Sequence, residues 1–167
     1  DKSRPAGQVL GKLLVQYQNH PQIFAAAMSS LNVSNMDHVL TEVLRLEKQV
    51  ESPLVLKLIG QGAAFNRLDS LVDCFERAVS HESEADGLVF LNRTAALLRE
   101  VRQHESTWKK LSERAEWKAK AVPVLNRGVD HSKTLLADSG ASAASKISAI
   151  RFLEVVGAGQ PAVSERL

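Results

Sequence analysis

The chain has 167 residues, close to the size of one domain, and 44% of them are hydrophobic, which is too many for a disordered chain. Aromatic residues make up only 5%, which favours packed helices over an aromatic-rich β core. The formal net charge of +2 is too balanced to indicate nucleic-acid binding by itself.

The single cysteine, Cys74, excludes an internal disulfide. It lies among Leu71, Val72 and Phe75, and this setting predicts a buried, inert thiol. We expect a soluble protein of the cytoplasm or another reducing compartment, although an exported cysteine-poor protein is also consistent with the sequence. No apolar run reaches the roughly 18 residues that a membrane-spanning helix needs, and no signal peptide is visible.

The beginning of the chain predicts a lead-in and two helices. Residues 1–7 are expected to be loose. Apolar residues at helical spacing predict a helix over 8–18. The residue before Pro21 avoids the helical conformation, so the helix is interrupted there. A second helix is expected over 21–31, with Pro21 in its first turn, where a missing amide costs little.

Two further helix starts are marked by serine. Ser34 followed by Asp37 is a weak capping box, and it opens the segment with the cleanest helical periodicity in the chain. Ser52 before Pro53 is a second cap. The helix that follows is short and almost wholly apolar, so we expect it to be buried and to end at Gly60–Gly62.

Residues 63–80 predict an amphipathic helix whose apolar face is flanked by carboxylates. These form an acidic stripe: Asp69, Asp73 and Glu76. Arg77 follows Asp73 by four residues, which places the two side chains together on one helix face. A solvated face is therefore favoured over a pair of carboxylates that performs acid–base chemistry.

The most informative stretch is 84–122, which contains no proline and one glycine. Apolar or small residues recur in it at helical spacing, and they predict one long helix, with a break near Glu105–Thr107 left open. Pro123 is expected to end or kink that helix, since a proline in a helix interior costs roughly 3 kcal/mol.

Two more helices are expected over 124–137, where Gly128 is a weak point, and over 142–156. The tail at 158–167 is expected to be loose. The whole chain, 1–167, is thus predicted to be a single all-α domain with seven to nine helices. An irregular multi-helix bundle is the first choice, and a stack of helical hairpins from a solenoid is the alternative.

No catalytic, metal or cofactor motif stands out, and neither metal nor cofactor is expected. Glu100 and His104 lie four apart, as two metal ligands could, but a metal site needs three or four ligands and no further motif completes the set. A helical enzyme of an unrecognised type would require a polar pocket that joins distant residues, for example His38, Asp73 and His131.

Basic residues are concentrated late in the chain, because residues 109–133 carry seven basic and three acidic side chains. Trp108 and Trp117 lie nine residues apart, on opposite faces of a continuous helix, and Trp108 shares its face with apolar residues. Trp117 would then lie in a basic-aromatic stripe of candidate binding residues: Lys110, Arg114, Trp117, Lys118, Lys120 and Arg127.

Two interpretations of Trp117 stay open. On a continuous helix it is exposed within the basic-aromatic stripe, where tryptophan and arginine together are typical of binding hot spots. If the helix breaks near residue 106, Trp117 can instead line a second face of the core.

The sequence favours a non-enzymatic protein–protein interaction module, an adaptor, scaffold or effector-like domain of a larger protein. Binding of the stripe to an anionic membrane or to nucleic acid is the alternative. The oligomeric state is left open.

Overall fold

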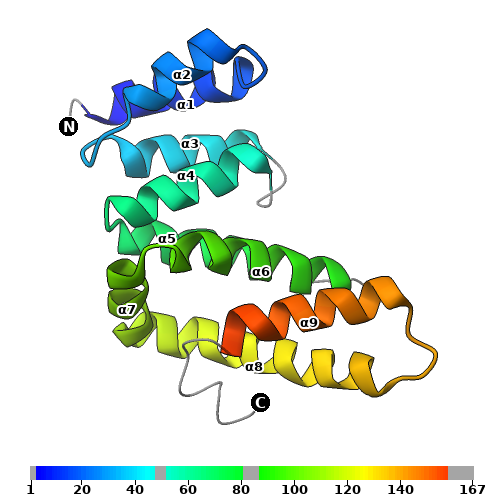
Figure 1. The fold of residues 1–167 in the computed structure, drawn as a ribbon. Coiled ribbons are helices and arrows are strands. Elements are labelled where there is room, and N and C mark those ends of the chain that lie inside the picture. The colour runs from blue at the N-terminus through cyan, green and yellow to red at the C-terminus, as the bar shows by residue number, and fades with distance from the viewer. Residues whose placement is uncertain (1–2, 48–51, 81–86, 158–167) are drawn as a thin grey trace.

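The computed structural model describes residues 3–47, 52–80 and 87–157, with the backbone alone described at 78–80 (Figure 1). Within these ranges the chain forms nine helices and no strand, so the predicted all-α fold is confirmed. The helices are α1 (Ser3–Gln16), α2 (Pro21–Ser29), α3 (Met36–Leu46), α4 (Pro53–Ala64), α5 (Leu68–Ser80), α6 (Gly87–Arg102), α7 (Glu105–Glu113), α8 (Ala115–Ala137) and α9 (Ala143–Gly157).

The helices follow one another in layers. Figure 1 shows α1 with α2 at one end, then α3 with α4, then α5 with α6, and finally α8 with α9 at the other end. The short helix α7 turns the chain from α6 into α8. The first half therefore consists of stacked short hairpins, whereas α6, α8 and α9 pack together as a small bundle.

The first helix packs closely on α3 through two glycines. A Cβ atom on Gly7 would lie 2.6 Å from a side-chain atom of α3, and one on Gly11 would lie 3.0 Å from another. Four-residue spacing places both glycines on one helix face. The helix begins at Ser3, so the loose lead-in expected over 1–7 is wrong from this residue onward. The loose tail expected at 158–167 lies outside the described residues.

The predicted start of α4 is confirmed and its predicted end is wrong. The Ser52 hydroxyl oxygen accepts the backbone N–H of Val55 at 3.3 Å, as an N-cap does. The helix continues through Gly60–Gly62 to Ala64, and Gly62 is buried against the neighbouring helices. It ends at Ala64, two residues before Asn66, which has a φ of 61°.

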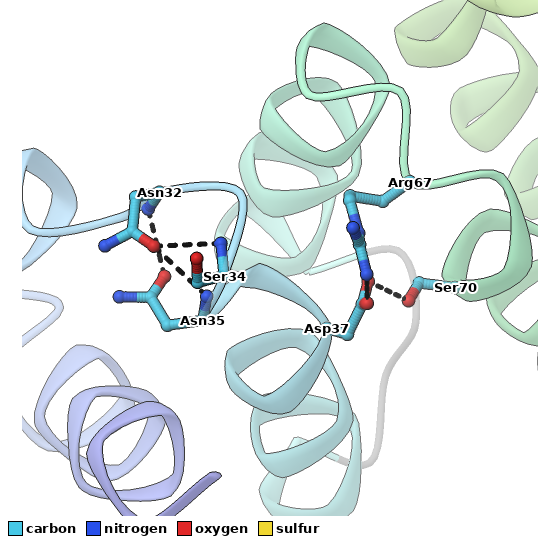
Figure 2. Close-up of polar contacts among 6 residues, drawn as sticks. All are labelled: Asn32, Ser34, Asn35, Asp37, Arg67 and Ser70. Atoms are coloured by element: carbon cyan, nitrogen blue, oxygen red, sulfur yellow. Dashed lines mark hydrogen bonds and ion pairs between the residues drawn. The ribbon is translucent and has the colours of Figure 1, made fainter. Parts of the chain in front are cut away.

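The capping box predicted at the start of α3 is absent. The Asn32 side-chain oxygen accepts the backbone N–H groups of Ser34 at 2.9 Å and Asn35 at 3.2 Å (Figure 2). Asn35 is the residue before α3, and its side chain makes no cap hydrogen bond. Asp37, the acidic member of the predicted box, instead pairs with Arg67, in the turn before α5, and with Ser70 of α5.

A single continuous helix over 84–122 is wrong, and the break left open near Glu105–Thr107 is present directly before Glu105. Residues 84–86 lie outside the described ranges. The chain leaves the helix at Gln103–His104 and again at Arg114, so α6, α7 and α8 are separate. Pro123 does not end the helix, since α8 continues through it. The carbonyl that loses its partner belongs to Ala119, an exposed residue, so water can satisfy it.

The core runs through all layers. Gly128 of α8 allows α9 to approach, because a Cβ atom there would overlap the Phe152 ring. Cys74 is buried as predicted, and this burial raises the pKa of its thiol to about 12. No helix within the described residues is long and apolar enough to cross a bilayer.

Candidate functional site

Trp117 belongs to the core, so the exposed aromatic member of the basic-aromatic stripe is a wrong prediction. Its side chain is 2% exposed, and its ring packs on Trp108 and on Phe75, with centroid separations of 5.8 Å and 4.7 Å. The break at Arg114 separates the two tryptophans onto different helices. The alternative interpretation, in which Trp117 lines a second face of the core, is therefore confirmed.

The five cations of the basic-aromatic stripe do not form a single line. Lys110 lies on α7, whereas Lys118, Lys120 and Arg127 lie on α8, and all four are exposed. Lys118 and Lys120 are two residues apart, so they point about 200° apart around the helix axis. Arg114 lies at the junction of α7 and α8, and its side chain is 31% exposed.

Two members of the acidic stripe on α5 pair with these cations. Asp69 Oδ1 lies 2.7 Å from Arg114 Nη2, and Glu76 forms an ion pair with Lys120. The hydrogen bond that Lys120 donates to Glu76 raises the pKa of Lys120. The sequence assigned the carboxylates to a solvated face and the cations to a separate binding stripe, because nothing local indicates that α5 and α8 are neighbours.

A polar cleft lies where three segments meet, and it has a volume of about 200 Å³. One side comes from α3, another from the turn between α4 and α5, and the third from the junction of α7 and α8. The residues that line this polar cleft are Asp37, Asn66, Arg67, Leu68, Asp69 and Arg114. Two arginines that are far apart in the sequence thus contribute to one concave surface.

The first arginine of the polar cleft is held firmly. Arg67 Nε donates to Asp37 Oδ1 at 2.8 Å, and Arg67 Nη2 pairs with the other oxygen of the same carboxylate (Figure 2). The Ser70 hydroxyl also donates to Asp37 Oδ1, at 2.5 Å. A carboxylate gripped at both oxygens fixes the plane of the guanidinium group, and each partner's side chain is only about one-third exposed.

The turn that presents Arg67 depends on Asn66. Asn66 adopts the left-handed conformation that ends many helices, and the N–H of Arg67 donates to the carbonyl of Gly62 at 2.9 Å. The buried hydroxyl of Thr107 donates to the carbonyl of Ala63 at 2.7 Å, which ties this turn to α7. Asparagine just beyond an apolar helix was the available sequence signal for this turn.

The second arginine is held loosely. Arg114 pairs with Asp69, whose side chain is 85% exposed, and at 3.3 Å with Glu116, which is 59% exposed. Exposed ion pairs of this kind contribute at most about 1 kcal/mol. Among the described residues, Nη1 of Arg67 and both Nε and Nη1 of Arg114 have no hydrogen-bond partner.

The residues named for a helical enzyme are not joined by the polar cleft. His38 lies against α1 beside Gly7, and His131 lies beside Gly87 at the start of α6. Within the ranges that the structure describes, no three His, Cys, Asp or Glu side chains could share a metal ion. Comparison of the chain with protein-family models, curated proteins and solved structures gives no match.

Proposed function

We propose that this chain is a non-enzymatic protein–protein interaction module that binds an acidic segment of a partner protein at the junction of α7 and α8. The observation that carries the proposal is the placement of the corner lysines, Lys110 and Lys118. Each lies four residues from Arg114 in the chain, and both are exposed. Neither has an ion pair with another described residue.

The junction is a rigid surface, which favours specific binding. Trp108 of α7 and Trp117 of α8, one on each side of the junction in the chain, are buried and pack edge to face, with their ring planes at 83°. Their packing holds the adjoining ends of α7 and α8 together, so the backbone positions that carry the lysines are set before a partner arrives. Preorganisation of this kind reduces the entropy that binding would otherwise cost.

An acidic partner follows from the local charge. Residues 109–133 carry seven basic and three acidic side chains, and the exposed lysines among them attract an oppositely charged segment and speed its association. A membrane-binding role has less support, because the buried Trp117 provides no aromatic group for insertion at a lipid surface.

The test is a titration of the chain with a capped, fluorescent octaglutamate peptide. The variant Lys110→Glu/Lys118→Glu should weaken binding by about tenfold or more, because it reverses both corner lysines. The control, Lys12→Glu/Lys57→Glu, makes the same charge change at exposed positions on α1 and α4. It should leave the affinity within about twofold.

Two results would contradict the proposal. Equal losses in both double variants would mean that only the total charge matters. Equally tight binding of single-stranded DNA or of anionic vesicles, abolished by moderate salt, would favour a general polyanion-binding surface instead.

A further inference from the structure

We infer that the polar cleft binds one carboxylate of that acidic segment, between the guanidinium groups of Arg67 and Arg114. This inference rests on the proposed function and names the contact that would make it specific. The polar cleft adjoins the corner lysines in the chain, since Arg114 lies between Lys110 and Lys118, four residues from each.

The donors for such a carboxylate are already in place. Asp37 occupies Nε and Nη2 of Arg67, which leaves Nη1. Asp69 and Glu116 both contact Nη2 of Arg114, which leaves Nε and Nη1. Guanidinium groups bind carboxylates through two parallel N–H donors, and each such edge of Arg114 includes Nη2, paired with either Nε or Nη1. A bound carboxylate therefore takes Nη2 from Asp69 and uses Nε or Nη1 as its second donor.

The two arginines have different roles in this site. Arg67 remains paired with Asp37 when the ligand binds, because that ion pair is bidentate, about one-third exposed and reinforced by the Ser70 hydroxyl. Arg114 can exchange its partner, because Asp69 is 85% exposed and returns to water at little cost. The carboxylate of a bound segment therefore replaces Asp69 on Arg114, and Asp69 acts as an internal competitor for the site.

The charge of the polar cleft favours a carboxylate over a phosphate. The two arginines are balanced by Asp37 and Asp69, and Glu116 adds a third negative charge beside Arg114. A ligand with a single negative charge meets less repulsion there than one with nearly two, as a phosphate group carries at neutral pH.

The probe for the site is capped glutamate, N-acetylglutamate methylamide, added to the whole chain. Binding is followed by the NMR signals of the Nε–H groups of Arg67 and Arg114, and we expect affinity in the range of about 1–10 mM. Arg114→Lys keeps the charge and loses the planar donors, so it should weaken binding by about threefold or more.

The decisive variant is Asp69→Asn, which removes the competitor. It should tighten binding of capped glutamate by about two- to fivefold. Its control is Asp73→Asn, which makes the same change one turn further along α5, at an exposed residue outside the polar cleft. The control should change the affinity by less than about 1.5-fold.

If the Arg114–Asp69 pair has only a structural role, we expect different results for these variants. Asp69→Asn would then leave the affinity equal to that of Asp73→Asn, and capped glutamate would not move the Arg67 and Arg114 signals. Either result overturns the inference, as does tighter binding of inorganic phosphate than of capped glutamate.

The inference and the proposed function fail in different ways. If octaglutamate binding depends on the corner lysines but is unchanged by Arg114→Lys and by Asp69→Asn, the proposed function stands and the carboxylate site is wrong. If capped glutamate moves the arginine signals and octaglutamate does not bind, the site stands and the proposed function is wrong.

Discussion

The indole rings of Trp108 and Trp117 meet edge to face, with their centroids 5.8 Å apart. Nine residues separate them, and on one continuous helix that spacing would direct them to opposite faces. Arg114 has an extended backbone, with φ at −66° and ψ at 136°, so the chain changes direction between them. One non-helical residue therefore brings both rings into the same core and creates the corner at which binding is proposed.

The Trp108→Phe variant isolates the fluorescence of Trp117. Because Trp117 is 2% exposed and packed on Phe75, we expect blue-shifted emission and weak quenching by acrylamide. Unfolding in guanidinium chloride should shift the emission to the red and restore quenching. Red-shifted, readily quenched emission from the folded variant would mean that Trp117 is at the surface and that the corner is built differently.

The sequence predicts where most of the helices lie, but it predicts few of the residues at which they begin and end. Periodic apolar residues locate α3, α5 and α9, and Ser52 correctly marks the start of α4. The ends are decided by tertiary contacts. Burial of two tryptophans outweighs the helical preference around Arg114, and packing keeps the helix intact through Pro123.

The polar cleft could not be predicted from the sequence, although one of its residues was. Arg114 was named as a binding residue, but on an interpretation that required an exposed Trp117. Asp37 was assigned to a helix cap and Asp69 to a solvated stripe, because a local pattern does not indicate which distant segment packs nearby. Arg67 had no signal of its own, since its position depends on the left-handed turn at Asn66.

Gly7→Ala tests the close contact between α1 and α3. In an exposed helix the change would be stabilising, but here the new methyl group would lie 2.6 Å from the Cβ of His38. We expect the free energy of unfolding to fall by about 1–3 kcal/mol, measured by urea denaturation.

Gly60→Ala is the matched control within α4. Its new Cβ meets only the end of the Glu100 side chain, at 3.3 Å, so it should be neutral or stabilising by up to about 1 kcal/mol. Equal effects of the two variants would show that α1 does not pack closely on α3.

Glu42 should make stability depend on pH. Its side chain is 7% exposed and accepts from Arg45 Nη2 at 2.7 Å and from Arg45 Nε at 3.0 Å. These hydrogen bonds lower the pKa of Glu42 below its ordinary value of 4.5, although burial opposes them. The folded chain therefore binds this proton less readily than the unfolded chain does. The stabilisation is complete above pH 4.5 and is lost as the pH falls through the lowered pKa.

We therefore expect Glu42→Gln to unfold more easily than the unmodified chain at pH 7, with a difference that shrinks as the pH falls below about 4.5. Thermal unfolding followed by circular dichroism across this range measures it. Glu113→Gln, at an exposed position near the end of α7, is the control and should show a smaller difference at pH 7. A difference for Glu42→Gln that stays constant down to low pH would rule out the ionised carboxylate as its source.

Asn66 links the stability of the α4–α5 turn to the polar cleft. Its φ of 61° is unfavourable for a residue with a β-carbon, although asparagine tolerates it better than most residues and glycine adopts it freely. We expect Asn66→Ala to lower the free energy of unfolding by about 1–2 kcal/mol. Asn66→Gly should leave it within about 0.5 kcal/mol, since glycine accepts the same backbone and loses only the side chain. Urea denaturation of the two variants measures the difference.

Because the turn positions Arg67, Asn66→Ala should also weaken binding of capped glutamate in the folded chain, and Asn66→Gly should preserve it. Equal stability of the two variants would mean that Asn66 does not adopt the left-handed conformation, and the geometry of Arg67 in the polar cleft would then be wrong as well.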